Sequence, residues 1–130
     1  MDSTSAVRGE VGTRVILENE VVRVWEMELK PGECFEFHEH HNDHLILYPA
    51  AATMRGQRPG DLGWTIEQDV EPGFTMYRTV GTGGSLEPHR LRNAGSETVV
   101  HYVVELLGPS ARAGAISQDN GRGRLSYADQ

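Results

Sequence analysis

Residues 31–44 read Pro31-Gly-Glu-Cys-Phe-Glu-Phe-His-Glu-His-His-Asn-Asp-His44, a turn followed by an alternating segment that holds four of the chain's six histidines. Neutral imidazole is the commonest protein ligand for metal ions. Because side chains at positions i and i+2 of a strand point to the same face, we expect His38 and His40 to lie side by side. The stretch therefore predicts half of a metal site on a β-strand.

Composition limits what the rest of the chain can be. Its 130 residues, 38% hydrophobic and 24% charged, are enough for one globular domain with a real core. The formal net charge of −7 argues against nucleic acid or an anionic membrane as the main partner. We therefore expect a small-molecule substrate, with no nucleic-acid partner and no membrane partner.

The N-terminus and the cysteine content bear on the compartment. Met1-Asp-Ser-Thr-Ser5 has no basic region followed by an apolar run, so it does not read as a secretory signal. No stretch approaches 18 apolar residues, so no membrane span is expected. Cys34 is the single cysteine, which excludes an intramolecular disulfide and fits a reducing compartment. We expect a cytoplasmic protein.

Short segments rich in β-branched and aromatic residues, separated by Gly and Pro turns, predict strands and no helix of ordinary length. They fall at residues 14–18, 21–29, 34–40, 44–48, 64–67, 75–80 and 98–107, with 50–54 continuing the sheet and 55–62 as a loop. This spacing indicates an all-β sandwich or barrel. We predict one domain over residues 14–107. Residues 1–13 are a loosely structured lead-in, and residues 108–130 are a tail that packs on the barrel or on a partner subunit.

The segment from 34 to 40 has two faces if it is a regular strand. Its alternation places Cys34 and Glu36 on the face of the metal-binding histidines. Phe35 and Phe37 then lie on the back of the sheet, where apolar rings need a cover. We therefore predict that the chain forms a homodimer.

A second motif lies about fifty residues after the first. The two read Gly32-x5-His38-x-His40-x3-His44 and Pro88-His89-x3-Asn93-x-Gly95. Together, over roughly residues 14–107, they resemble the cupin superfamily motifs G-x5-H-x-H-x3,4-E-x6-G and G-x5-P-x-G-x2-H-x3-N. The resemblance implies a conical jelly-roll barrel of two antiparallel sheets with one divalent transition metal (Fe, Cu, Ni, Zn or Mn). It also implies His38, His40 and His89 as ligands.

The chain departs from the family pattern at the glutamate of the first motif, which is replaced by His44. Two interpretations follow from the resemblance. In one, His44 is a fourth metal ligand, and four neutral ligands leave the metal a stronger Lewis acid. In the other, three histidines bind and His44 is an acid/base group beside the metal. The second motif also lacks the P-x-G spacing, and Ala51 stands where the first motif ends in glycine.

Other residues are candidates for the site. Glu36 is predicted either to act as an acid/base group or orient a ligand imidazole, or to stand in water at the barrel mouth. Arg78, with Arg23, is a candidate to pair a substrate carboxylate, and the alternative is a structural salt bridge. His41 has the opposite parity from its neighbours and reads as a solvated loop histidine. The predicted substrate pocket contains Trp25, Met27, Tyr77, Arg78, His101 and Tyr102.

Three functions fit this pattern. The favoured one is a mononuclear non-haem metal dioxygenase, because three neutral ligands leave room for both a chelating substrate and O₂. The second is a non-redox lyase, isomerase, cyclase or hydrolase that uses the metal as a Lewis acid, favoured if all four histidines bind. The third is a non-catalytic cupin that only binds a small molecule.

Overall fold

The computed structural model describes residues 9–81, 86–110 and 114–127. These ranges contain eleven strands and no helix. The strands are β1 (Arg14–Glu18), β2 (Val22–Leu29), β3 (Cys34–His38), β4 (His44–Tyr48), β5 (Ala52–Gln57), β6 (Ile66–Val70), β7 (Phe74–Arg78), β8 (His89–Asn93), β9 (Val99–Leu106), β10 (Ser117–Asp119) and β11 (Gly123–Tyr127). With no helix in these ranges, nothing in the described chain has the form of a membrane-crossing helix.

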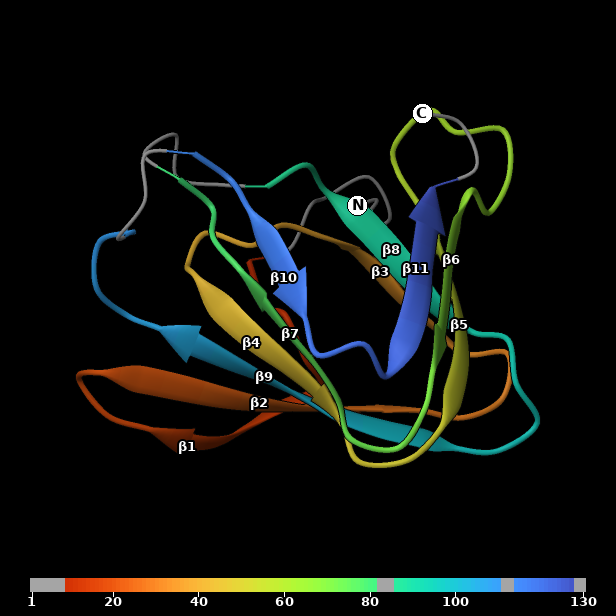
Figure 1. Ribbon diagram of the computed structural model, residues 1–130, viewed down its shortest axis with the longest axis horizontal. Coiled ribbons are helices and arrows are strands. Elements are labelled where there is room, and N and C mark those ends of the chain that lie inside the picture. Colours follow the sequence, from red (N-terminus) through yellow and green to blue (C-terminus); the bar gives the residue numbers. More distant parts are fainter. Residues whose placement is uncertain (1–8, 82–85, 111–113, 128–130) are drawn as a thin grey trace, which may run out of the picture.

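The strands form two antiparallel sheets that face each other (Figure 1). The large sheet has the order β1-β2-β9-β4-β7-β10, and the small sheet has the order β11-β6-β5-β8-β3. Strands far apart in the sequence are neighbours, such as β2 with β9 and β3 with β8. The predicted all-β class and double antiparallel sheet are therefore confirmed, and the order of strands is consistent with a jelly roll.

Two differences from the expected strands have clear causes. Residues 55–57 were expected in a loop because of Gly56, yet they continue β5. A Cβ at Gly56 would lie 3.1 Å from the Cβ of Ile66, so the glycine lets β5 and β6 approach closely. Beyond residue 108, where a tail is expected, β10 pairs with β7 and β11 pairs with β6. The C-terminal segment thus adds one strand to each sheet.

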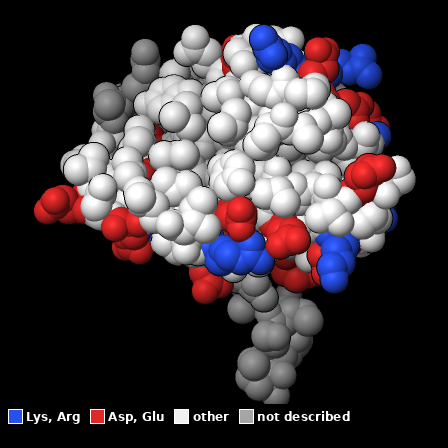
Figure 2. Space-filling view, turned by 90° about the horizontal axis from the view of Figure 1, so that it is seen from below, with Lys and Arg blue, Asp and Glu red and all other residues white. Residues whose placement is uncertain are grey.

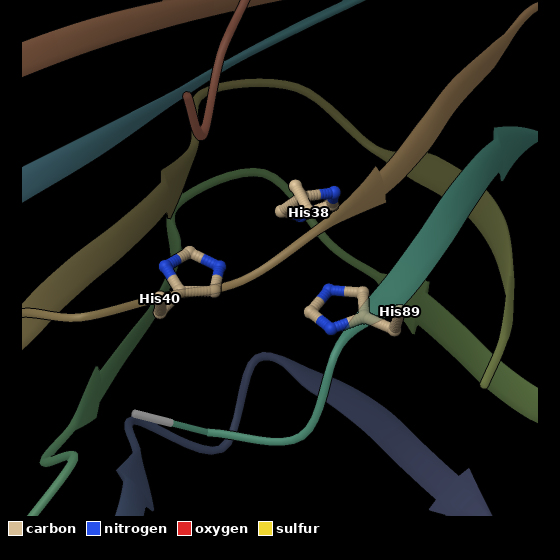
Figure 3. Close-up of side chains that lie close together, drawn as sticks. All are labelled: His38, His40 and His89. Atoms are coloured by element: carbon tan, nitrogen blue, oxygen red, sulfur yellow. The ribbon is translucent and has the colours of Figure 1, made fainter. Parts of the chain in front are cut away.

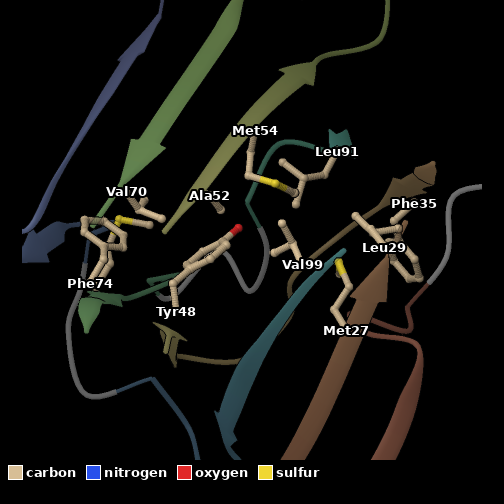
Figure 4. Close-up of a cluster of buried hydrophobic side chains, with 11 residues drawn as sticks. Met27, Leu29, Phe35, Tyr48, Ala52, Met54, Val70, Phe74, Leu91 and Val99 are labelled. Carbon is tan, nitrogen blue, oxygen red and sulfur yellow. The ribbon is translucent and has the colours of Figure 1, made fainter. Parts of the chain in front are cut away.

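The interior between the sheets is apolar at one end. Figure 4 shows side chains from both sheets meeting in one cluster of buried residues, which comprises Met27, Leu29, Phe35, Tyr48, Ala52, Met54, Val70, Phe74, Met76, Leu91 and Val99. Asn93 ties this end together, because its amide donates to the carbonyls of Leu29 and Glu97 and its oxygen accepts from the Gly95 amide.

The prediction that Phe35 lies on the back of the sheet is wrong. The pairing of β3 with β8 shifts register between Phe35 and His38, which is a β-bulge. An extra residue in a strand reverses the alternation beyond it, so Phe35 and His38 face the same interior. Phe35 is buried in the core cluster, and its ring lies 4.9 Å from that of His38. Phe37 is partly buried elsewhere, with the Arg90 guanidinium over its ring.

Candidate metal centre

Three histidines converge at the edge of the small sheet. His38 ends β3, His40 follows in the next loop, and His89 begins β8 directly opposite His38 in the register. One ring nitrogen from each lies within 4.8 Å of the other two. Figure 3 shows the three imidazoles turned toward one another from β3, from the loop after it and from β8. The structure therefore brings together the three histidines that the two sequence motifs predict as metal ligands.

Hydrogen bonds orient two of these rings. His38 Nδ1 lies 3.0 Å from the carbonyl oxygen of Glu36, and the ring of His89 is hydrogen-bonded to the backbone of Glu87. A ring that donates one N–H to a carbonyl leaves its other nitrogen free to bind a metal. His40 Nδ1 is buried with no hydrogen-bond partner. Oriented rings and an unpartnered buried nitrogen fit a divalent transition metal.

Burial keeps the imidazoles of His40 and His89 neutral. Desolvation, reinforced by the neighbouring histidines and Arg78, holds the pKa of His40 and the pKa of His89 well below the ordinary value. Only a neutral imidazole can bind a metal. His40 and His89 are therefore ready to bind a metal at neutral pH without losing protons first.

His44 stands beside this group at the start of β4. Its ring is fully buried and stacks on that of His40, with centroids 4.0 Å apart. His44 Nδ1 donates to the carbonyl of Asn42 at 2.8 Å, while its Nε2 is buried without a partner. Burial lowers its pKa to about 4. The three-nitrogen group does not include His44, so its two predicted roles remain alternatives.

Two buried carboxylates, absent from the sequence-based candidates, hold the loop behind His44. Glu105 accepts from the indole N–H of Trp25 at 2.6 Å and from the amide of Asn42 at 3.1 Å. Asp43 accepts from the Val80 amide and from the Ser110 hydroxyl. These hydrogen bonds hold residues 42–44 in place. They therefore also determine the position of the His44 ring.

A cavity of about 300 Å³ opens next to the histidines. Both sheets line it, and three of the residues predicted for the pocket are among its walls: Met27, Arg78 and His101. Lining residues that sequence reasoning missed include Ile46, Tyr48, Arg58, Gln68 and Leu125. Ile46 and Tyr48 share the parity of His44 on β4, and this alternation is the signal that would have found them.

The other three residues predicted for the pocket are not among those that line this cavity. Trp25 is buried, but it packs with Val11 and Val103 and donates to Glu105. Tyr77 and Tyr102 alternate with the inward residues of β7 and β9, so they point outward. The Tyr102 hydroxyl donates to Glu26 at 3.3 Å.

His101 lines the same cavity as His38, His40 and His89. It is 3% exposed, its ring stacks on Tyr48 with centroids 4.2 Å apart, and its Nδ1 has no hydrogen-bond partner. Burial lowers its pKa to about 3. His101 is therefore a neutral polar group facing an otherwise apolar stretch of the cavity.

Positive charge lies close to the histidines although the chain is acidic overall. Arg78 is opposite His44 in the register of β7 and β4. Its charge contributes to the lowered pKa of His40, His44 and His89. Arg58 also lines the cavity and is held by Asp61 at 3.2 Å. Arg78 thus places a cation at the cavity wall near the three histidines, and the acidic Glu87 lines the same cavity.

The remaining candidates lie outside the cavity. The Glu36 carboxylate lies 3.5 Å from Arg90, so only its backbone carbonyl reaches the site, through His38. His41 is exposed and lies 3.5 Å from Glu39. Cys34 is half-buried, and burial raises the pKa of its thiol to about 11. Arg23 pairs with Glu18 and Glu105. It therefore forms the structural salt bridge that was the alternative to a contact with a substrate carboxylate.

Known proteins resemble this chain in fold. No protein-family model and no curated protein matches its sequence. A crystal structure of a cupin domain from Bordetella pertussis Tohama I superposes with a TM-score of 0.60 at 20% identity, over 78% of this chain and 96% of that one. The pirin YhhW from Escherichia coli, in complex with nickel(II), superposes with a TM-score of 0.56 at 17% identity. That match covers 78% of this chain and 42% of the pirin.

Proposed function

We propose that this chain, which has the cupin fold, binds one divalent transition metal through His38, His40 and His89 and acts as a mononuclear non-haem dioxygenase on a small organic molecule. One observation carries the proposal. Three imidazoles present nitrogens within 4.8 Å of one another at the wall of a cavity of about 300 Å³. The nickel(II) of the pirin neighbour supports a divalent metal in this fold.

The ligand count favours oxygen chemistry. Three protein ligands on a metal that accepts six leave up to three positions, enough for a chelating substrate and O₂ together. A redox-active metal held there would supply the electron transfer between them. The chain's own residues do the rest: Met27, Ile46 and Met76 give the cavity apolar walls that restrict water.

The cavity also suggests the class of substrate. Its volume is at the lower end of the range for ligand pockets, about 300–1,000 Å³. The guanidinium of Arg78 lines it beside the histidines, and guanidinium groups bind carboxylates bidentately. We propose a small carboxylate whose acid group contacts Arg78 while an adjacent oxygen faces the ligand nitrogens. We propose that His44, whose buried Nε2 has no hydrogen-bond partner, takes or returns a proton.

A second candidate is a non-redox reaction such as that of a lyase, isomerase, cyclase or hydrolase. The buried Nε2 of His44, which has no hydrogen-bond partner, favours it, because turning that nitrogen toward the other histidines would add a fourth ligand and leave fewer positions for O₂. The same donors would then serve a Lewis acid that polarises a carbonyl or activates water.

Metal analysis with oxygen uptake separates the two. Purified protein would be assayed for iron, copper, nickel, zinc and manganese, then tested on a panel of small carboxylates in an oxygen electrode. One iron or copper per chain with substrate-dependent O₂ uptake supports the dioxygenase. Turnover with zinc or manganese and no O₂ uptake supports the second candidate. A protein that holds no metal after reconstitution with each ion, or a His38→Ala variant that holds it as well as the parent, contradicts both.

A further inference from the structure

Two buried polar side chains line the cavity from opposite sheets. His101 of β9 is 3% exposed and Gln68 of β6 is 7% exposed, and both belong to the walls of the cavity beside the three histidines. Within the part of the chain that the structure describes, neither side chain makes a hydrogen bond, and His101 Nδ1 is buried without a partner. Buried polar groups in proteins nearly always have a partner, so this pair needs an explanation.

The neighbours of both groups on the adjacent strands are apolar. Met27 of β2 lies opposite His101. Met54 of β5 and Leu125 of β11 lie on either side of Gln68. Figure 4 shows Met27 and Met54 in the buried cluster between the sheets. The fold therefore supplies neither polar group with a partner, and a hydrogen-bonding group buried in this way destabilises the protein unless a ligand or water satisfies it.

Both groups are uncharged. Burial lowers the pKa of His101 to about 3, so at neutral pH its imidazole has one N–H donor and one acceptor nitrogen. The carboxamide of Gln68 likewise offers donor N–H groups and an acceptor oxygen. A charged ligand group held between the two would find no opposite charge on either of them, so the pair favours an uncharged group that hydrogen-bonds.

The charged side chains lie elsewhere. Figure 2 shows, for one face, acidic and basic side chains at the molecular surface. Those that line the cavity are less buried than His101 and Gln68: Arg58 and Arg78 are partly buried, and Glu87 is exposed. The cavity wall thus has charged residues that solvent reaches and a neutral polar pair that solvent hardly reaches.

We propose that His101 and Gln68 form a second subsite of the cavity, which binds an uncharged hydroxyl or carboxamide group of the substrate. The inference rests on the proposed function, in which Arg78 contacts the acid group of a small carboxylate. It adds a chemical requirement, namely that the preferred acid also carries a hydroxyl or an amide. Such a group both donates and accepts, so it can pair with one residue as a donor and with the other as an acceptor.

The geometry of His101 suits recognition. Its ring stacks on that of Tyr48, with centroids 4.2 Å apart and planes inclined by 16°, and this packing holds the imidazole in one orientation. A site whose buried polar groups pair with a substrate hydroxyl rejects an analogue that lacks it, because those groups then stay unpaired. His101 and Gln68 should therefore determine specificity without binding the metal.

Nuclear magnetic resonance titrations of the full chain, loaded with zinc so that no redox turnover occurs, test the inference. The probes are γ-hydroxybutyrate, butyrate, and butan-1-ol, which has a hydroxyl but no acid group. The parent chain should bind γ-hydroxybutyrate about 10-fold more tightly than butyrate or better. In Gln68→Leu and in His101→Phe, which replace a polar group by an apolar one of similar size, this preference should fall to about 2-fold or less.

Matched controls make the same changes at exposed positions. Gln118→Leu on β10 and His41→Phe should keep the preference of the parent chain. The backbone amide spectrum of each variant verifies that it folds. Should His101→Phe fail to fold, Gln68→Leu decides alone.

The outcomes separate the subsite from the proposed function. Equal binding of γ-hydroxybutyrate and butyrate by the parent chain overturns the subsite and leaves the Arg78 contact standing, as would happen if the two residues only held water. A preference that persists in both variants also overturns it. If neither acid binds, the Arg78 contact fails and butan-1-ol decides: weaker binding to the variants than to the parent supports the subsite, and equal binding overturns it.

Discussion

The imidazole of His44 lies parallel to that of His40, with centroids 4.0 Å apart and planes inclined by 14°. The three ring nitrogens that converge at the candidate site belong to His38, His40 and His89, and His44 is not among them. His44 is moreover held by its hydrogen bond to the Asn42 carbonyl. This arrangement favours His44 as a neighbour of the metal ligands that moves a proton.

Replacing His44 with glutamine separates the two roles. For an acid/base group, we expect metal stoichiometry to be unchanged and turnover to fall by about 10²–10⁴-fold. Metal analysis and steady-state kinetics give the two readouts. The control is His41→Gln, which changes an exposed histidine three residues away. Loss of metal from His44→Gln but not from His41→Gln would instead make His44 the fourth ligand.

Replacing Arg78 with glutamine tests the proposed carboxylate contact. A charge-assisted hydrogen bond contributes about 1.5–3 kcal/mol, so KM for the carboxylate substrate should rise by roughly 10- to 100-fold. Metal content should stay the same, because no arginine binds the metal. Arg78→Lys should recover part of the loss. Arg55→Gln, at an arginine paired with Asp69, is the matched control. An unchanged KM in Arg78→Gln would rule out the contact.

Phe35 and Phe37 should differ sharply in their contribution to stability. Truncating a buried aromatic ring leaves a cavity, so Phe35→Ala should lower the free energy of unfolding by about 3–5 kcal/mol. Phe37 lies outside the core cluster with its ring against Arg90, and Phe37→Ala should cost about 1 kcal/mol or less. Urea unfolding measures both. Equal losses for the two variants would be incompatible with the bulge in β3.

Phe35 and Phe37 also show which features of the fold the sequence alone does not predict. Strands 14–18 and 44–48 were predicted with their observed bounds, because alternation and turn residues are local signals. The bulge is set by the pairing of β3 with β8, and nothing in residues 34–40 encodes it locally. A single extra residue moved Phe35 inward and Glu36 away from the cavity.

The candidate site also has residues that the sequence predicts and residues that it does not. The motif spacing named His38, His40 and His89, which the fold brings together from strands about fifty residues apart in sequence. Asp43 and Glu105 were not identified, because their roles depend on partners such as Val80 and Trp25 that only the tertiary structure supplies. Residues 114–127 show little periodicity, so their strands depend on the sheet edges that they join.

His101 should make stability depend on pH in the weakly acidic range. Burial lowers its pKa from about 6.5 to about 3, so between these values the unfolded chain binds a proton that the folded chain does not. The free energy of unfolding therefore falls as the pH drops through this range. Between pH 7.5 and 5.5 this residue alone should remove about 1.4 kcal/mol. Urea unfolding with a chelator present, on the parent and on His101→Phe, isolates the effect. The variant should lose less stability on acidification, and equal losses would mean that His101 titrates normally when folded.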